Sequence, residues 1–267
     1  MIEGIEFPWD PAEFDTLLDL TQYDEALNIS LGAIKGKDAK ILEAGCGGGR
    51  VVKYLHDLGY INAYGIELGI SAVAHINNRF PNLKIIQGDI LSMPYPQGEF
   101  DLILSFGVVE HFMAGLELPL SRLKEVLKPG GVAMITVPSQ NILRRIIDLL
   151  NLEILGHNGR SSFRKCKWPQ RNKSVRGYYV YPKYGEFFEY RLTPREFESA
   201  CLNAGFEIIQ SVPTCHDDGM FHVFGAVTTA YKDKVFHHNL IGRIANRLLK
   251  MIPFCHNHMH ACLLRRK

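Results

Sequence analysis

The sequence lacks an uninterrupted apolar run of about 20 residues, the length that a membrane-spanning helix requires. Its amino-terminal residues 1–10 contain neither a basic cluster nor an apolar stretch, so we expect no secretory signal there. The six cysteines have no repeated spacing, which disfavours a disulfide framework and favours a reducing compartment. Together these absences predict a cytoplasmic protein.

Internal repeats, low-complexity tracts and a strong charge imbalance are also missing, since the net charge is only +2. A balance so close to zero gives no global case for binding nucleic acid or a membrane surface. Hydrophobic residues make up 46% of the chain and charged residues 22%, which is ordinary for a globular protein. At 267 residues, the chain is long enough for a core domain with an inserted subdomain.

What the sequence does contain is a glycine-rich turn between two apolar segments. Residues 39–44 predict a short buried strand, and helical spacing begins after Arg50. Four of the five positions 45–49 are glycine, the residue needed where a backbone turns with positive φ or where a ligand lies against the main chain. The helix start beyond the turn offers unpaired N–H groups, so the segment predicts a loop that holds a nucleotide-like ligand.

The positions of these glycines and of one acid narrow the class of ligand. A dinucleotide-binding loop has glycine at its first, third and sixth positions, but the sixth position here is Arg50. Glu43 stands two residues before the first glycine, where its charge would oppose a pyrophosphate and favour a ligand with an amino group. A nicotinamide-dependent dehydrogenase is therefore disfavoured.

Further strand-like segments alternate with helical patterns along the chain. They are residues 63–67, 83–87, 100–106, 132–138 and 206–210. This alternation predicts an α/β fold with a mostly parallel sheet. Glu67 ends the second strand next to the first, where an acid can accept both hydroxyls of a ribose. A solvated charge at a strand end is the alternative reading of Glu67.

Several motifs together resemble those of the class I S-adenosylmethionine-dependent methyltransferases. They are the acid and triple-glycine loop at 43–49, the Glu110–His111 pair after the fourth strand, the Lys-Pro-Gly-Gly junction at 128–131, and LTPREFESACLNAGFEII at 192–209. The resemblance implies S-adenosyl-L-methionine as cofactor. It also implies a Rossmann-like, doubly wound sheet of seven strands, mostly parallel, with an antiparallel last strand.

The resemblance also assigns parts of the cofactor to particular residues. Glu67 would hold the ribose, Leu68 would touch the adenine, and Asp89 would accept a hydrogen bond from the adenine amine. A ligand-free Asx-turn is the alternative for Asp89. The other implied cofactor-binding positions lie in the loop and beside the third and fourth strands: Glu43, Gly45, Cys46, Gly47, Gly49, Ile90 and Ser105.

His111 is the candidate catalytic residue, because a neutral imidazole can take a hydroxyl proton as the methyl group moves. A histidine that only shapes the following helix is the alternative. Some related enzymes bind a metal with an additional Glu three positions before this pair, but Gly107 stands there, so we predict no metal. Residues 255–262 contain Cys and His without the spacing of a structural zinc site, and we predict no metal there either.

Residues 139–192 do not fit the core pattern and predict an inserted substrate lid, which leaves 1–138 and 193–267 as the core. Positions 160–176 hold seven Lys or Arg and no acid, and a run of aromatic residues follows. This composition favours a small methyl acceptor with an anionic group and a flat or apolar body. A solvated loop packed by its own aromatic residues is the alternative.

We therefore expect methyl transfer to an oxygen or nitrogen of a small molecule. The segment after the fourth strand lacks an Asn-Pro-Pro-Tyr type motif, which disfavours nucleic acid and protein as substrates. Two alternatives stay open. One is an RNA-modifying methyltransferase with the 160–176 run as a phosphate track. The other is a non-catalytic relative that keeps the cofactor pocket. The sequence does not predict the oligomeric state.

Both ends of the chain also carry a pattern. Residues 10–34 have helical spacing, and such a segment either caps the ligand cleft or packs on the sheet edge. Residues 240–252 predict an amphipathic helix with cations on its other faces. For the last strand of the sheet, we prefer residues 261–267 over 221–227.

Overall fold

The computed structural model describes residues 10–150, 162–165, 177–180, 189–224, 228–232 and 235–267. The chain divides into two compact units. Unit 1 consists of residues 1–136, 200–210 and 262–267, and unit 2 of residues 137–199 and 211–261. Unit 2 contains all of the expected lid, 139–192, and also residues 137–138, 193–199 and 211–261, which we had expected in the core.

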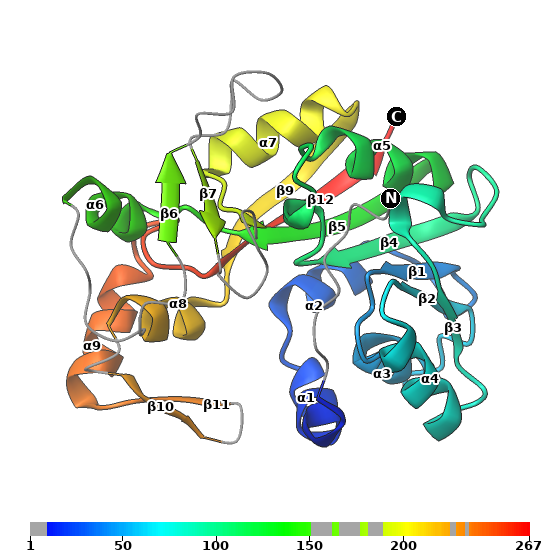
Figure 1. The fold of residues 1–267 in the computed structure, drawn as a ribbon, viewed down its shortest axis with the longest axis horizontal. Coiled ribbons are helices and arrows are strands. Elements are labelled where there is room, and N and C mark those ends of the chain that lie inside the picture. The colour runs from blue at the N-terminus through cyan, green and yellow to red at the C-terminus, as the bar shows by residue number, and fades with distance from the viewer. Residues whose placement is uncertain (1–9, 151–161, 166–176, 181–188, 225–227, 233–234) are drawn as a thin grey trace. The chain divides into compact units, whose positions relative to one another are not determined.

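A seven-stranded sheet has the order β3-β2-β1-β4-β5-β12-β9 (Figure 1). Its strands are β1 (Ile41–Ala44), β2 (Ala63–Glu67), β3 (Lys84–Gln87), β4 (Phe100–Phe106), β5 (Leu127–Pro138), β9 (Phe206–Thr214) and β12 (Met259–Arg266). The first five pair in parallel, whereas β12 runs in the opposite direction to β5. The predicted seven-stranded, mostly parallel Rossmann-like sheet with an antiparallel last strand is confirmed.

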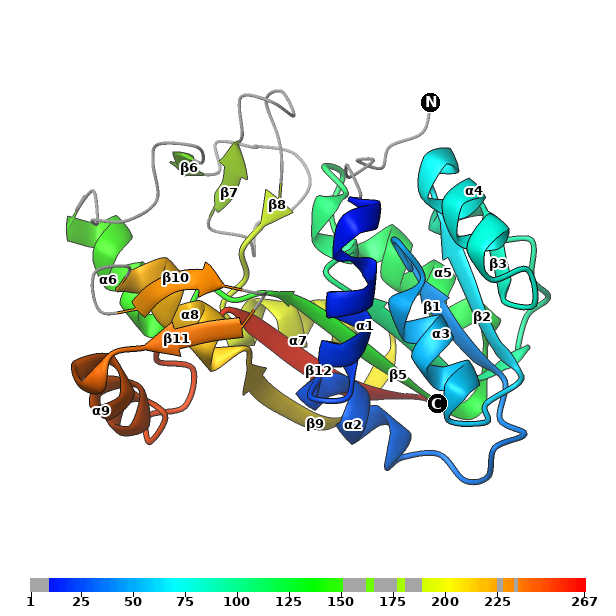
Figure 2. The ribbon, with the colours of Figure 1, turned by 90° about the horizontal axis from the view of Figure 1, so that it is seen from below.

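The helices of unit 1 follow the predicted alternation with the strands. They are α1 (Phe14–Thr21), α2 (Glu25–Leu31), α3 (Arg50–Asp57), α4 (Ile70–Arg79) and α5 (Glu117–Val126). In the two views, α3 lies on one face of the sheet and α5 on the other (Figure 2). Because both faces are covered, β1 and β4 are buried along most of their length, as is usual for parallel strands.

The amino-terminal helix α1 packs against the helices that follow β1 and β2. Phe14 lies 5.6 Å from Phe80 between ring centroids, and Arg79 forms an ion pair with Asp15 at 2.6 Å. The guanidinium of Arg79 also lies 4.9 Å from the ring of Phe14. The helices predicted for residues 10–34 are thus confirmed, and α1 packs against the end of α4. The second predicted role of this segment, covering a cleft, stays a prediction.

Unit 2 contains α6 (Ile142–Leu150), α8 (His216–Val223) and α9 (Leu240–Leu249), together with two small antiparallel sheets. One sheet has the order β6 (Ser162–Lys165), β7 (Gly177–Val180) and β8 (Glu189–Tyr190), and the other pairs β10 (Thr228–Lys232) with β11 (Val235–His238). α7 (Pro194–Asn203) continues from unit 2 into unit 1. Residues 221–223 belong to α8, so a strand at 221–227 was wrong for this part, and residues 225–227 lie outside the described residues.

Candidate cofactor-binding site

The glycine loop connects the end of β1 to the first turn of α3. The backbone N–H groups of Gly45 and Cys46 both donate to the carbonyl oxygen of Ile66, at 2.9 and 3.1 Å. These bonds fix the loop beside the end of β2. Gly45, Gly47 and Gly49 have φ values of 81°, 52° and 75°, a region that side chains with a Cβ rarely adopt. The predicted strand, turn and helix start are therefore confirmed.

The three glycines with positive φ serve different purposes. A Cβ on Gly45 would stand 2.5 Å from a methyl carbon of Val108, and one on Gly49 would stand 2.6 Å from a methyl carbon of Ile85. These two glycines are required by packing within the protein. A Cβ on Gly47 would meet no described atom within 4 Å. Gly47 is therefore the position where the backbone faces open space and a ligand can approach it.

Glu67 connects the glycine loop to the start of α4. Its Oε2 accepts a hydrogen bond from the backbone N–H of Gly47 at 2.8 Å, and its Oε1 accepts one from Gly69 at 2.9 Å. A carboxylate has about four acceptor positions, so each oxygen can still accept a hydroxyl proton. The acid stands at the carboxyl end of β2, beside the open face of Gly47, as the sequence pattern predicted.

Glu43 is a buried carboxyl group beneath the same loop. Burial raises its pKa to about 8, although the guanidinium of Arg50 and a hydrogen bond from the backbone N–H of Val52 oppose this shift. Val52 lies in the first turn of α3, so Glu43 accepts from one of the N–H groups that a helix start leaves unpaired. Its Oε2 has no hydrogen-bond partner in the described part of the chain. A ligand with a cationic amino group would supply one.

The side chain of Cys46 points into the core and not toward a ligand. Its Sγ lies 2.8 Å from the place where a Cβ on Gly65 would stand, and burial raises the pKa of its thiol well above the usual value. Ser105 is fully buried in β4, and its Oγ has no partner among the described residues. The side chain of Cys46 is therefore not available to a cofactor, and only its backbone can contact one.

The predicted adenine residues follow β2 and β3. Asp89 caps a 3₁₀ turn, Ile90–Ser92, by accepting from the N–H of Leu91 at 2.9 Å, and Ile90 itself is buried. Leu68 is half-buried, and its carbonyl oxygen accepts from the side chain of Gln87 at 3.2 Å. The N–H of Gly88 donates to the carbonyl oxygen of Glu67 at 2.8 Å, which ties the two segments together. Their contact with adenine stays a prediction.

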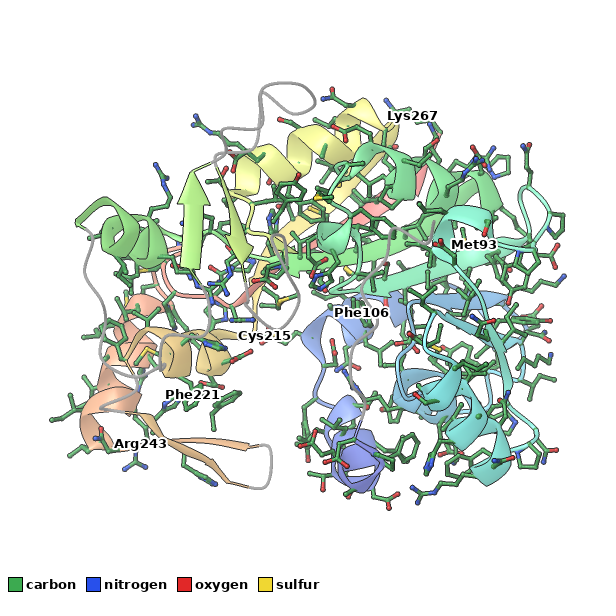
Figure 3. The ribbon with its side chains drawn as sticks, viewed as in Figure 1. Met93, Phe106, Cys215, Phe221, Arg243 and Lys267 are labelled. Carbon is green, nitrogen blue, oxygen red and sulfur yellow. The ribbon has the colours of Figure 1, made fainter. Side chains whose placement is uncertain are left out.

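His111 ends a 3₁₀ turn, Val109–His111, that follows β4, whose carboxyl end is marked by Phe106 in Figure 3. Its Nε2 lies 3.7 Å from Oε1 of Glu110, and both side chains are buried. Val108, just before the turn, contacts the glycine loop at Gly45. The candidate base therefore belongs to a segment that begins beside the loop.

The sequence reasoning missed the role of Arg50, which it used only to exclude a dinucleotide. Arg50 donates from Nη1 to Thr21 Oγ1 at 2.8 Å and lies 3.9 Å from Asp24. It also lowers the pKa of Glu43. Arg50 thus links the amino-terminal helices to the loop. Its partners are far away in the sequence, so no local pattern marks them.

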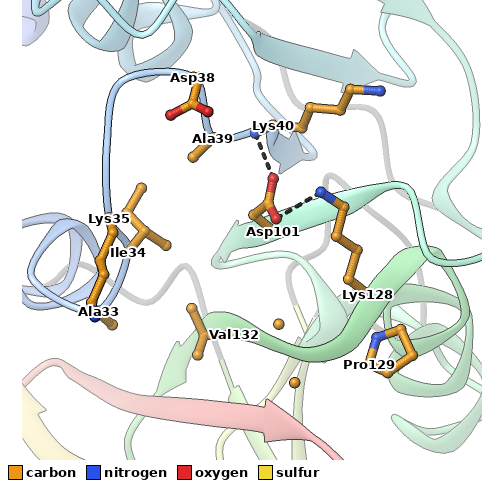
Figure 4. A pocket seen from close by; sticks show the side chains of 12 residues that line it. Ala33, Ile34, Lys35, Asp38, Ala39, Lys40, Asp101, Lys128, Pro129 and Val132 are labelled. Atoms are coloured by element: carbon orange, nitrogen blue, oxygen red, sulfur yellow. Dashed lines mark hydrogen bonds and ion pairs between the residues drawn. The ribbon is translucent and has the colours of Figure 1, made fainter.

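A separate pocket of about 520 Å³ lies at the amino ends of the strands (Figure 4). Its lining includes Asp101, which accepts from the backbone N–H of Lys40 at 2.9 Å and pairs with Lys128 at 2.7 Å. In open α/β sheets, ligands bind outside the carboxyl ends of the strands. The glycine loop and Glu67, at the other end of β1 and β2, therefore stay the candidate cofactor site.

Within the described ranges, Asp218, His222 and His258 form a group with the spacing of metal ligands, since one potential ligand atom of each lies within 4.8 Å of the others. Arg144 Nη2 lies 2.7 Å from Nδ1 of His258. A guanidinium can only donate, so Nδ1 must accept, and the proton of the neutral ring then sits on Nε2, which faces Asp218 at 3.8 Å. This arrangement leaves His258 no free Nε2 lone pair for a metal. The prediction of no bound metal stays a prediction.

Comparisons with known proteins found a matching family and several similar proteins. Residues 42–135 match the family described as "Methyltransferase domain". A protein of Mycolicibacterium smegmatis named "Probable S-adenosylmethionine-dependent methyltransferase" is 31% identical over 105 residues, which are 39% of each chain. A fatty-acid O-methyltransferase of the same organism is 29% identical over 124 residues, which are 44% of each chain. The matches thus span less than half the length of these relatives.

A solved S-adenosylmethionine-dependent methyltransferase from Mesorhizobium loti has a similar fold. It covers 93% of this chain and 100% of its own, with a TM-score of 0.55 and 15% identity, a likeness that shows the fold alone. The sequence match begins in β1, includes the glycine loop and Glu67, and ends in β5. Residues 42–135 of this chain are therefore similar to the methyltransferase domain family, and the matched segment contains the glycine loop and Glu67.

Proposed function

We propose that this protein transfers a methyl group from S-adenosylmethionine to an oxygen or nitrogen atom of a small molecule. The observation that carries the proposal is the combination of an open glycine backbone at Gly47 with two carboxyl groups, Glu43 and Glu67, at the carboxyl ends of β1 and β2. The cofactor supplies a methyl group that is already activated on a sulfonium. The protein then has to bind the cofactor and the acceptor, orient them toward each other, and exclude water from the site.

Each of the two acids fits one polar part of the cofactor. Glu67 is held by the N–H groups of Gly47 and Gly69, which fixes its carboxylate for two ribose hydroxyls. Glu43 has a buried oxygen without a described partner, and an ammonium group placed there would form a charge-assisted hydrogen bond. Asp89 uses Oδ1 to cap its turn and has a second oxygen for the adenine amine.

We propose His111 as the group that takes the proton of the acceptor. A hydroxyl acceptor must lose its proton as the methyl group arrives, and an ammonium acceptor must lose one beforehand, because its nitrogen has no free lone pair. An imidazole is suited to take either proton near neutral pH, whereas an ionised carboxylate needs no base. The carboxyl oxygen of Glu110 at 3.7 Å would stabilise the imidazolium that forms. Exchange of His111 for Gln would then lower the rate of transfer to a hydroxyl or amine acceptor, have little effect on transfer to a carboxylate, and leave cofactor affinity nearly unchanged.

The names of the relatives support a carboxylic acceptor with an apolar body. Besides the fatty-acid O-methyltransferase, a malonyl-[acyl-carrier protein] O-methyltransferase of Salmonella typhimurium is 30% identical over 105 residues, which are 39% of this chain and 41% of that protein. Both names describe O-methylation of an acid. The expected lid at 139–192 is the proposed binding region for this body, although most of its basic run, 166–176, lies outside the described residues.

The test measures cofactor binding and methyl transfer separately. Calorimetry with S-adenosylmethionine and with S-adenosylhomocysteine should show binding of both, and labelled cofactor should transfer methyl groups to fatty acids or to another small molecule of a cell extract. Failure of both compounds to bind at millimolar concentration would contradict the proposal. Binding without any labelled product would favour the non-catalytic alternative, and label found only in RNA would favour the RNA-modifying one.

A further inference from the structure

Helix α9 in unit 2 has an unusual orientation, because its buried side is polar. It begins after Asn239, which caps it by accepting from the N–H of Gly242 at 2.8 Å. The buried residues of α9 are Gly242 and Asn246, which lie one turn apart on the same face. The Asn246 amide group donates to Asp217, and its oxygen accepts from Nε2 of His256 at 2.7 Å. This polar network attaches α9 to unit 2.

The outward side of α9 and of the turn that follows is apolar. Its large apolar residues are between 50% and 77% exposed: Leu240, Ile241, Ile244, Leu248, Met251 and Ile252. Leu240, Ile244 and Leu248 follow at four-residue steps and therefore form one row along the helix. Single exposed apolar residues are common, but a contiguous row marks a surface that binds an apolar partner.

Cations border this apolar row. Arg243, Arg247 and Lys250 are exposed and lie three or four positions apart, and Arg243 is labelled in Figure 3. Lys250 lies 3.8 Å from Asp217, which is on α8. Residues 235–267 contain no Asp or Glu at all. The surface of α9 therefore combines an apolar row with a positively charged edge. No acidic residue in 235–267 neutralises this charge.

We propose that α9 docks this protein on the surface of an anionic lipid bilayer. The apolar row would enter the boundary between headgroups and acyl chains, while the cations would contact lipid phosphates. α9 has 10 residues, and no described helix is long and apolar enough to cross a membrane, so the helix lies in the plane of the interface. A second copy of the chain fits less well, since two α9 surfaces face to face would bring like charges together.

The experiment is cosedimentation of the full chain with vesicles of phosphatidylcholine alone and of phosphatidylcholine mixed with phosphatidylglycerol. We expect binding to the anionic vesicles, weaker binding to the neutral ones, and release by salt. Each cation near the surface is worth roughly a fivefold change in affinity, so R243Q/R247Q should weaken binding to anionic vesicles about 25-fold. I241Q/I244Q should weaken binding to both kinds of vesicle by at least about tenfold.

A matched control removes two exposed apolar residues elsewhere. I61Q/L202Q changes side chains that are 63% and 54% exposed, outside α9, and should leave vesicle binding unchanged. All of the variants alter exposed positions, so their melting temperatures and cofactor affinities should match the parent protein. Equal binding to neutral and anionic vesicles, an equal loss in I61Q/L202Q, or a dimer that depends on α9 in analytical ultracentrifugation would each overturn the proposal.

Discussion

The two compact units use their polar side chains in different ways. In unit 1, α3 buries Val51, Val52 and Leu55, and the ionisable groups of the site lie at the carboxyl ends of the strands. In unit 2, α9 buries Gly242 and Asn246 and exposes its apolar side. Unit 1 thus keeps its polar groups for a ligand, whereas unit 2 uses them as interior structure.

The interior of unit 2 shows this second use in detail. Ser211 donates from Oγ to Glu198 at 2.6 Å, so its oxygen accepts from Nε2 of His260 at 2.7 Å. The ring of His260 lies between Phe197 and Phe254, at 5.1 and 4.7 Å between centroids. Buried polar groups are usually hydrogen-bonded, and His260 forms such a bond through Nε2. We therefore expect unit 1 to respond to changes at the cofactor site and unit 2 to lose stability as the pH falls.

The largest effect should come from Gly47, at the open face of the loop. Gly47→Leu would place a side chain where the cofactor has to lie, and no described atom of the protein blocks this side chain within 4 Å of its Cβ. The affinity for S-adenosylmethionine should fall to an undetectable level in calorimetry, while the fold is kept. Strain at the positive φ should cost about 1–2 kcal/mol of stability.

Gly59 provides the matched control, because it also has a positive φ and no described atom near its Cβ position, but it follows the other end of α3. Gly59→Leu should lower the melting temperature by a similar amount and leave the affinity for the cofactor unchanged. An equal loss of affinity in both variants would mean that strain in α3, and not occupation of the site, explains the result.

A smaller effect is expected from Glu67→Ala. Two hydrogen bonds from ribose hydroxyls to a charged acceptor contribute about 2–4 kcal/mol, so affinity should fall roughly 30-fold to 1,000-fold. The variant also leaves the N–H groups of Gly47 and Gly69 without their partner. Binding of adenosine and of ribose-free adenine separates the two causes. The loss should appear with adenosine and be small with adenine; an equal loss with both would point to a displaced loop.

The sequence predicted the glycine loop and the parallel sheet because both depend on short-range patterns. β2 and β4 have the predicted bounds, and the acid at the end of β2 lies beside the loop as expected. Residues 261–267 were preferred for the last strand, and β12 confirms this choice. An unbroken apolar run flanked by turns determines such elements locally.

Other features depend on contacts between distant residues, and the sequence did not reveal them. Periodicity indicated an amphipathic helix at 240–252, but its pattern does not tell which face is covered, and here the apolar face is exposed. The helical segment at 216–223 has Asp217, Asp218 and Gly219 in its first turns, which weakens a helix pattern, and it was considered in part as a strand. The partners of Arg50 and Glu43 come from tertiary structure alone.

The pH response of unit 2 is the third prediction. Burial lowers the pKa of His256 from 6.5 to about 4. The unfolded chain takes up a proton below pH 6.5 but the folded chain only below 4, so stability should fall as the pH drops from 6.5 to 4 and change little below that. The whole shift corresponds to a change of about 3 kcal/mol in the free energy of unfolding. Hydrogen exchange of peptides from α8 and α9 should show this loss.

Two variants test the assignment to His256. In His256→Gln, the amide group can still donate to Asn246, but it cannot be protonated in this range, so the exchange rates should depend less on pH. His237→Gln, at an exposed position of β11, should keep the pH dependence of the parent protein. If His256→Gln keeps the full pH dependence of the exchange rates, the titration of another group in unit 2 is responsible for it.

The last prediction concerns Glu43 in unit 1, and here the sign is opposite. Burial raises its pKa from 4.5 to about 8, so the folded chain holds a proton that the unfolded chain has lost, and this group favours folding less as the pH rises from 4.5 to 8. A cationic cofactor should bind the ionised form. Its affinity should therefore rise with pH by up to about tenfold per unit below pH 8, with release of one proton.

Calorimetry in buffers of different ionisation enthalpy measures this proton directly. Glu43→Gln keeps an acceptor for the N–H of Val52 but cannot ionise, so both the proton release and the rise of affinity with pH should disappear. The free enzyme should then gain stability at pH 8 relative to the parent, because a buried ionisable group has been removed. Unit 2 should keep its own loss of protection between pH 6.5 and 4 in this variant. An unchanged proton release would assign the titration to a different group of unit 1 and remove Glu43 as the partner of the cofactor's amino group.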